Sequence, residues 1–125
     1  MEILLWILAG LLAVVFATSG TTKLVSSRER LIERTPWVEQ FPHPSVRGIG
    51  ALEVLGAIGL ILPAALGIAP WLTAFAAAGL GITMVFAALL HLRREEDDLS
   101  AAMPAIVLGI LSVFVAWMRF GPYAF

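Results

Sequence analysis

Cysteine is absent from this chain of 125 residues, and the only histidines are His43 and His91. Without cysteine there is no disulfide, no thiol catalysis and no cysteine-ligated metal. Two histidines are too few to make a convincing histidine metal cluster. We therefore expect no metal site.

Charged residues are also scarce, because Asp, Glu, Lys and Arg make up 14% of the chain whereas apolar residues make up 60%. A soluble core of this size could not bury so much apolar surface. The net charge is only −1, and the basic residues form no stripe interleaved with aromatics, so we expect no nucleic-acid partner. These properties predict an integral membrane protein in contact with the lipid bilayer.

Four apolar segments are each long enough to cross a membrane as a helix. A helix rises about 1.5 Å per residue and the hydrocarbon core is about 30 Å thick, so roughly 20 residues suffice. Strand-like alternation is missing, and a helix keeps its backbone hydrogen bonds within one segment. The first segment follows a lone Glu2 rather than a basic leader, so we expect it to be retained. We predict one transmembrane domain over residues 1–125, with spans at 3–25, 46–66, 71–92 and 100–118.

The four residues GIAP, at 67–70, make a very short connection between the second and third spans. Such a connection makes the two spans antiparallel neighbours. Ser45 is expected to cap the start of the second span and Gly67 to end it. The predicted fold class is therefore all-α, an antiparallel up-down-up-down four-helix transmembrane bundle.

Basic residues are distributed unequally between the two ends of the predicted bundle. Arg119 alone lies at one end, and the other seven lie at the opposite end: Lys23, Arg28, Arg30, Arg34, Arg47, Arg93 and Arg94. Positively charged short loops of membrane proteins stay in the cytoplasm. We therefore expect a multi-pass protein of the cell inner (plasma) membrane, with both termini outside and both charged loops cytoplasmic.

The loop at 26–45 mixes charges with apolar residues such as Leu31 and Trp37. One interpretation is a short amphipathic segment on the inner interface of the membrane. The other is an ordinary polar loop with scattered apolar residues, because three prolines interrupt any periodicity. Both interpretations stay open from the sequence.

Glu53 is the only polar residue in the segment GALEVLGAIGLILP at 50–63. Counting along the helix places its carboxylate about 10 Å below the inner interface, at the depth of Ser19 and one turn deeper than Lys23. Ser19, Thr22 and Lys23 share one helix face because they are spaced by three and four residues. We therefore expect Glu53 to meet partners contributed by another helix.

Two interpretations of Glu53 follow from the energetics. An unpaired carboxylate in a membrane helix costs roughly 2.5 to 3.5 kcal/mol, so it should face inward and contact Lys23 or His91 or take up a proton. The contact is either an ion pair that sets helix register or part of a ligand or proton site. Gly50 and Gly56 on the same face would leave room for a neighbouring helix or for a ligand.

The remaining polar residues have ordinary structural interpretations as well. Lys23 could extend to the lipid headgroups, and His91 could complement the C-terminal dipole of its helix. Ser19 and Thr22 could donate to carbonyls of their own helix.

Several stretches of the sequence resemble the DoxX-like family of small bacterial membrane proteins. They are TSGTTKL (18–24), PWVEQFP (36–42), GALEVLGAIGLILP with GIAPWLT (50–73) and MVFAALLHLRRE (84–95). The resemblance implies a four-helix membrane bundle. Relatives named for a quinol oxidase subunit or for membrane-bound oxidoreductase assemblies imply a redox accessory role. Matched residue by residue, the family pattern corresponds here to Gly20, Lys23, Glu53, Gly56, Gly59, Pro63 and His91.

No set of nucleophile, base and orienting residue and no phosphate-binding loop can be assembled from this sequence. We therefore predict a non-enzymatic accessory membrane component that binds a ligand or a membrane-protein partner. The candidate residues lie in the cytoplasmic half of the bundle: Ser19, Thr22, Lys23, Glu53, Gly56 and His91. The alternative is a subunit of a quinone-linked membrane oxidoreductase, with quinone as the cofactor and Glu53 and His91 handling its protons. Assembly into a homo-oligomer is a further open alternative.

Overall fold

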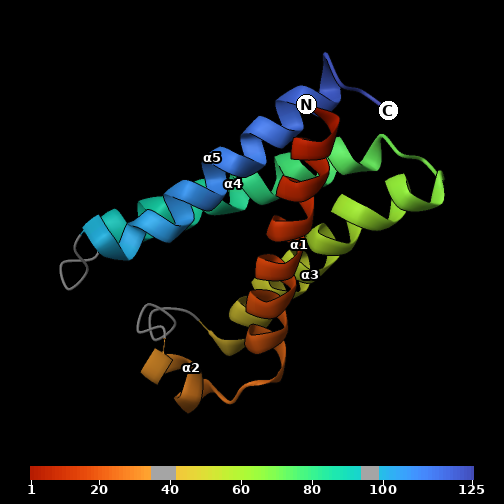
Figure 1. The fold of residues 1–125 in the computed structure, drawn as a ribbon. Helices are drawn as coiled ribbons and strands as arrows, with labels where there is room; N and C mark the ends of the chain where they lie inside the picture. The colour runs from red at the N-terminus through yellow and green to blue at the C-terminus, as the bar shows by residue number, and fades with distance from the viewer. Residues whose placement is uncertain (35–41, 94–98) are drawn as a thin grey trace.

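A computed structural model describes residues 1–34, 42–93 and 99–125, apart from the side chains of residues 34 and 99–101. The regular structure of these residues is entirely α-helical (Figure 1). The helices are α1 (Glu2–Val25), α2 (Arg28–Arg34), α3 (His43–Leu66), α4 (Leu72–Arg93) and α5 (Leu99–Phe120). The predicted all-α fold class is confirmed.

Four of these helices are long and apolar enough to cross a membrane: α1, α3, α4 and, from Ala102 onward, α5. Their bounds lie within three residues of the predicted spans. Large apolar side chains on them are exposed, among them Leu11, Leu55, Phe86 and Ile110. Such an outward-facing apolar surface fits contact with lipid, as the composition predicted.

The two ends of α3 test the predicted capping residues. The prediction that Ser45 caps this helix is wrong, because Pro42 is the N-cap and the helix begins at His43. Pro44 is compatible with this first turn because its position needs no backbone N–H donor. At the other end Gly67 adopts the left-handed conformation (φ 69°) as the C-cap, as predicted, and a residue with a Cβ would be strained there.

The four long helices form two closely packed pairs. The most extensive packing joins α1 to α3 and α4 to α5, while α3 and α4 connect the pairs. The neighbouring contacts of Gly59 with Ala76 and of Leu60 with Thr73 are consistent with an antiparallel arrangement of α3 and α4. The pairs lie close together at the end of the bundle that carries both chain termini, and they diverge toward the end that carries α2 (Figure 1). These are called below the terminal end and the α2 end.

The hydrophobic core lies where the two pairs cross. Every long helix contributes buried side chains to one cluster: Leu5, Leu12, Phe16, Ala57, Leu60, Ala77, Leu80, Met84, Ala105, Val115 and Ala116. Thr73 of α4 is buried in the same region and donates its hydroxyl hydrogen to the carbonyl of Leu60 at 3.2 Å. This hydrogen bond satisfies a polar group that would otherwise be unpaired in an apolar interior.

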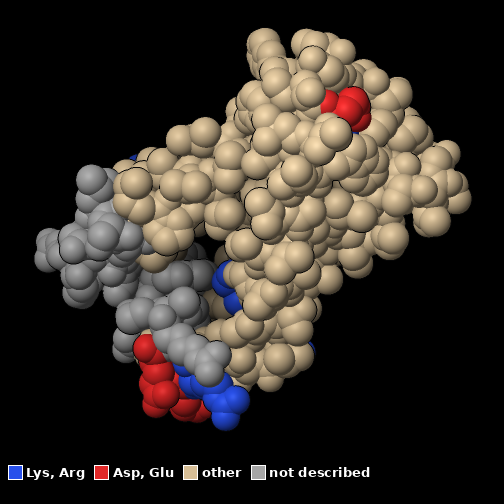
Figure 2. Space-filling view, in the orientation of Figure 1, with Lys and Arg blue, Asp and Glu red and all other residues tan. Residues whose placement is uncertain are grey.

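The short helix α2 accounts for part of the segment at 26–45. Leu31 is buried against Val46, with Ile32 beside them, so the apolar side of α2 packs on the start of α3. The backbone N–H of Arg30 donates to Ser27 Oγ at 3.3 Å, which helps to begin the helix. Figure 2 shows acidic and basic atoms gathered at the α2 end, whereas most of the remaining face is uncharged. Trp37 lies outside the described residues.

Candidate functional site

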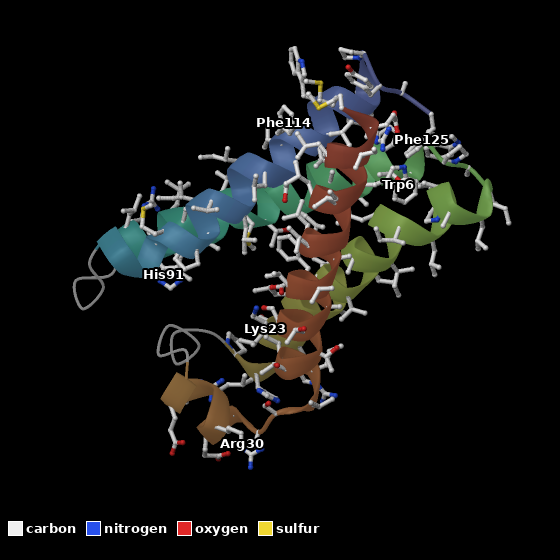
Figure 3. The ribbon with its side chains drawn as sticks, in the orientation of Figure 1. Trp6, Lys23, Arg30, His91, Phe114 and Phe125 are labelled. Carbon is white, nitrogen blue, oxygen red and sulfur yellow. The ribbon has the colours of Figure 1, made fainter. Side chains whose placement is uncertain are left out.

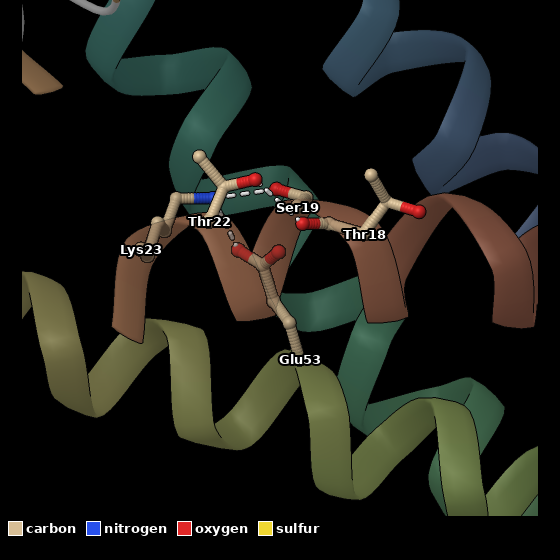
Figure 4. A network of polar contacts seen from close by, with 5 residues as sticks. All are labelled: Thr18, Ser19, Thr22, Lys23 and Glu53. Carbon is tan, nitrogen blue, oxygen red and sulfur yellow. Dashed lines mark hydrogen bonds and ion pairs between the residues drawn. The ribbon is translucent and has the colours of Figure 1, made fainter. Parts of the chain in front are cut away.

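Ser19, Lys23 and Glu53 form a hydrogen-bonded chain between α1 and α3 (Figure 4). Lys23 Nζ lies 2.7 Å from Glu53 Oε1 and donates to Ser19 Oγ, also at 2.7 Å. The side chain of Glu53 is 2% exposed and that of Lys23 is 13% exposed. These three residues are called the polar cluster below. They give the buried carboxylate a counter-charge supplied by another helix, as the depth comparison predicted.

Two glycines allow α1 and α3 to come close enough for this ion pair. A Cβ added to Gly20 would lie 2.5 Å from the carbonyl oxygen of Gly50. A Cβ added to Gly50 would lie 2.7 Å from the carbonyl oxygen of Gly20 and 2.8 Å from Lys23 Cβ. The backbones are therefore in direct contact, as small residues permit between membrane helices.

Gly56 contacts α4 and not the polar cluster. A Cβ at this position would lie 2.7 Å from one methyl carbon of Leu80 on α4. The space above Gly56 is thus filled by Leu80, and the same glycine helps α3 to pack against α4. Of the two uses expected for the clearance around Glu53, the structure shows packing of neighbouring helices at both Gly50 and Gly56.

Thr22 turns its hydroxyl to its own helix. Its Oγ1 donates to the carbonyl of Thr18 at 2.9 Å, and Thr18 Oγ1 donates to the carbonyl of Val14 at 2.8 Å. Thr22 lies beside Lys23 in Figure 4, but its hydroxyl hydrogen bond remains within α1. The hydroxyl hydrogens of both threonines are therefore used within the helix.

His91 lies on α4 at the α2 end, apart from Lys23 (Figure 3). The α4–α5 pair diverges from the α1–α3 pair toward this end. Lys23 and His91 are therefore far apart although both lie near the same end of their membrane spans. The hydrogen bonds of Glu53 to other described residues involve Lys23 and not His91. The structure therefore joins Ser19, Lys23 and Glu53, while Thr22 and Gly56 make other contacts and His91 lies apart.

The second carboxylate oxygen of Glu53 stands out within the described part of the chain. Oε2 is buried and accepts no hydrogen bond from those residues. An unsatisfied buried polar atom typically costs about 1–3 kcal/mol, and more when it is charged. Oε1 and Oε2 of the same group are thus in unequal environments, because Oε1 is paired with an ammonium group and Oε2 has no donor among the residues that the structure describes.

A second charged contact, at the terminal end, was not foreseen from the sequence. Arg119 Nη1 lies 2.7 Å from Glu2 Oε1 and donates to the carbonyl of Tyr123 at 2.9 Å. The guanidinium carbon is 3.9 Å from the centre of the Phe125 ring, and that ring packs edge-on against Trp6 (Figure 3). The distribution of basic residues had identified Arg119 only as the single basic residue of that end. The sequence did contain a signal for this pairing, because Glu2 lies in the first turn of the first span and Arg119 lies in the last turn of the last span.

Comparison with known proteins addresses the family of the chain. No curated protein and no solved structure matched it. The model of the DoxX-like family matches residues 7–115, a range that includes the polar cluster and both glycines of the α1–α3 contact. Because this match covers most of the chain, the protein belongs to the DoxX-like family.

Proposed function

We propose that this protein is a non-enzymatic component of the membrane that binds a small amphipathic molecule at the polar cluster. The observation that carries the proposal is Glu53, a carboxylate that is almost fully buried with one oxygen unsatisfied among the described residues. Ionisable residues inside membrane segments generally serve ligand, ion or proton sites. A bound molecule would supply the partner that the described side chains do not.

The arrangement of the helices supports access to this site. Lys23 is more exposed than Glu53, so the polar cluster is approached past its ammonium group. The helix pairs diverge toward the α2 end, and Figure 2 shows a hollow there with basic atoms at its edge. A molecule entering between the pairs would meet Lys23 first and Glu53 behind it.

We further infer that the α2 end faces the cytoplasm and that both termini face outward, with the protein in the inner membrane. Five of the six fully described basic side chains support this orientation because they lie toward the α2 end: Lys23, Arg28, Arg30, Arg47 and Arg93. Arg119 lies at the other end. The bias agrees with retention of positively charged short loops in the cytoplasm.

The proposal is tested by recovering bound small molecules from protein extracted directly into lipid discs with its native membrane. Mass spectrometry should find an amphipathic molecule on the wild type that is lost from the double variant Lys23→Met/Glu53→Leu. Glu2→Gln is the matched control, because it alters a carboxylate at the terminal end and should keep the molecule. If the double variant retains the same molecules as the wild type, the polar cluster is not their binding site.

The identity of the recovered molecule separates the two functional hypotheses. A quinone recovered together with a redox partner would favour the quinone-linked subunit over an accessory role without redox chemistry. A molecule without redox chemistry would favour the accessory role.

A further inference from the structure

We propose that the molecule bound at the polar cluster is a neutral amphiphile whose head group donates a hydrogen bond, from a hydroxyl or an N–H, to Oε2 of Glu53. This inference rests on the proposed function and adds the chemical class of the ligand. The two oxygens of the Glu53 carboxylate differ in their hydrogen-bond partners. Oε1 is paired with Lys23, whereas Oε2 is buried without a donor from the described residues.

Polar side chains of α1 direct their hydrogen bonds to atoms other than Glu53 Oε2. Two N–H groups of Lys23 are directed to Glu53 Oε1 and Ser19 Oγ. The hydroxyls of Thr18 and Thr22, drawn together with Glu53 in Figure 4, donate to carbonyls of their own helix. Two of the three N–H groups of Lys23 and both threonine hydroxyls are thus committed, and none of the described residues donates to Oε2. We infer that a bound molecule supplies that donor.

Binding of a proton would not satisfy this oxygen. A protonated Oε2 would become an O–H donor that itself needs an acceptor. Protonation would also remove the negative charge that pairs with Lys23 and leave the ammonium group without its counter-ion. A donor group from outside the protein satisfies Oε2 and keeps the ion pair intact.

The charge of the polar cluster selects a neutral ligand. Lys23 and Glu53 together carry no net charge, and they lie in a membrane-spanning part of the protein. A charged head group placed beside them would add an uncompensated charge to a region of low dielectric constant. A neutral hydroxyl or N–H group meets the hydrogen-bonding requirement without that penalty.

Apolar side chains of α1 and α4 suit the remainder of an amphiphile. Phe16 lies about one helical turn from Ser19 on α1 and belongs to the buried core. On α4, Met84 is in the same core, and Ala87 and Ala88 pack against it while staying partly exposed. Of these side chains, Ala87 and Ala88 keep exposed apolar surface that suits the hydrocarbon part of an amphiphile.

A pair of probes that differ in one donor tests the inference: 4-hexylphenol and its methyl ether, 4-hexylanisole. The protein is placed in phosphatidylcholine discs, because that headgroup has no hydrogen-bond donor, and binding above that of empty discs is measured by equilibrium dialysis. We expect saturable binding of the phenol that is roughly tenfold or more tighter than binding of the ether, as loss of a hydrogen bond to a charged group implies.

Glu53→Gln provides a variant with an opposite expectation. Lys23 offers only donors, so the amide oxygen of glutamine should take the place of Oε1 and the amide NH₂ the place of Oε2. The preference for the phenol should then disappear or reverse. Glu2→Gln makes the same chemical change at the terminal end and should leave the preference unchanged.

Equal affinities of the two probes for the wild type would overturn the inference, and so would a lack of saturable binding of both. Either result leaves the recovery of native molecules as an independent test of the proposed function. If Glu53→Gln fails to fold, the ratio of the two wild-type affinities still decides the question.

Discussion

Arg119 pairs with Glu2 across 117 positions of the chain, so one ion pair ties the last membrane helix to the first. The side chain of Arg119 is 2% exposed, whereas that of Glu2 is 52% exposed. This contact closes the terminal end, where the helix pairs meet, while the ion pair of Lys23 with Glu53 joins α1 to α3 toward the α2 end. The two charged contacts thus hold different parts of the bundle.

Replacement of Arg119 by methionine should destabilise the protein by about 1.5–3 kcal/mol, the usual range for hydrogen bonds to charged groups. The variant loses the bonds to Glu2 and to the Tyr123 carbonyl as well as the stacking on Phe125. Thermal unfolding in detergent measures the effect. Glu2→Gln should cost less than about 1 kcal/mol because its side chain is half exposed. An unchanged melting temperature for Arg119→Met would contradict the assigned role.

Gly50→Ala should destabilise the α1–α3 contact by roughly 1–3 kcal/mol, the usual range for overpacking. The new Cβ would meet the carbonyl oxygen of Gly20, which cannot move independently of its helix. Gly48→Ala is the matched control, because a Cβ there meets nothing within 4 Å. That control should be neutral or stabilising by up to about 1 kcal/mol through helix propensity. Equal melting temperatures for the two variants would show that the close backbone approach does not limit stability.

Glu53→Leu alone should be more damaging than the double replacement Lys23→Met/Glu53→Leu. The single variant leaves a partly buried ammonium group without its carboxylate, and breaking a buried ion pair typically costs about 3–5 kcal/mol. Extension of the lysine toward the headgroups should reduce that cost. The double variant should lie within about 1 kcal/mol of the wild type in thermal unfolding. A double variant as unstable as the single one would mean that the pair is not the source of the effect.

Reporter fusions should place the C-terminus outside and the connection between α4 and α5 in the cytoplasm. The physical reason is the concentration of basic residues at the α2 end. A periplasmic reporter should be active when fused after Phe125 and inactive when inserted within residues 93–98. Cytoplasmic activity of the C-terminal fusion would reverse the proposed orientation.

The sequence by itself determined the number, length and helical nature of the membrane spans. These properties depend on hydropathy and on the rise of a helix, which are local quantities. The inward position of Glu53 followed from the cost of exposing a carboxylate to lipid, and Lys23 was one of its two expected partners. Gly67 was identifiable as a helix end because few other residues adopt its backbone conformation.

Only the tertiary structure decided how the spans turn and diverge relative to one another. Depth along the helix axis placed His91 near Glu53, but depth says nothing about the direction in which α4 leaves the crossing point. The spans are apolar on nearly all sides, so their sequences specify no single buried face. For the same reason, three features could be identified only from the packed helices. They are the contact of Leu80 with Gly56, the pairing of Arg119 with Glu2, and the lack of a donor to Glu53 Oε2 from the described residues.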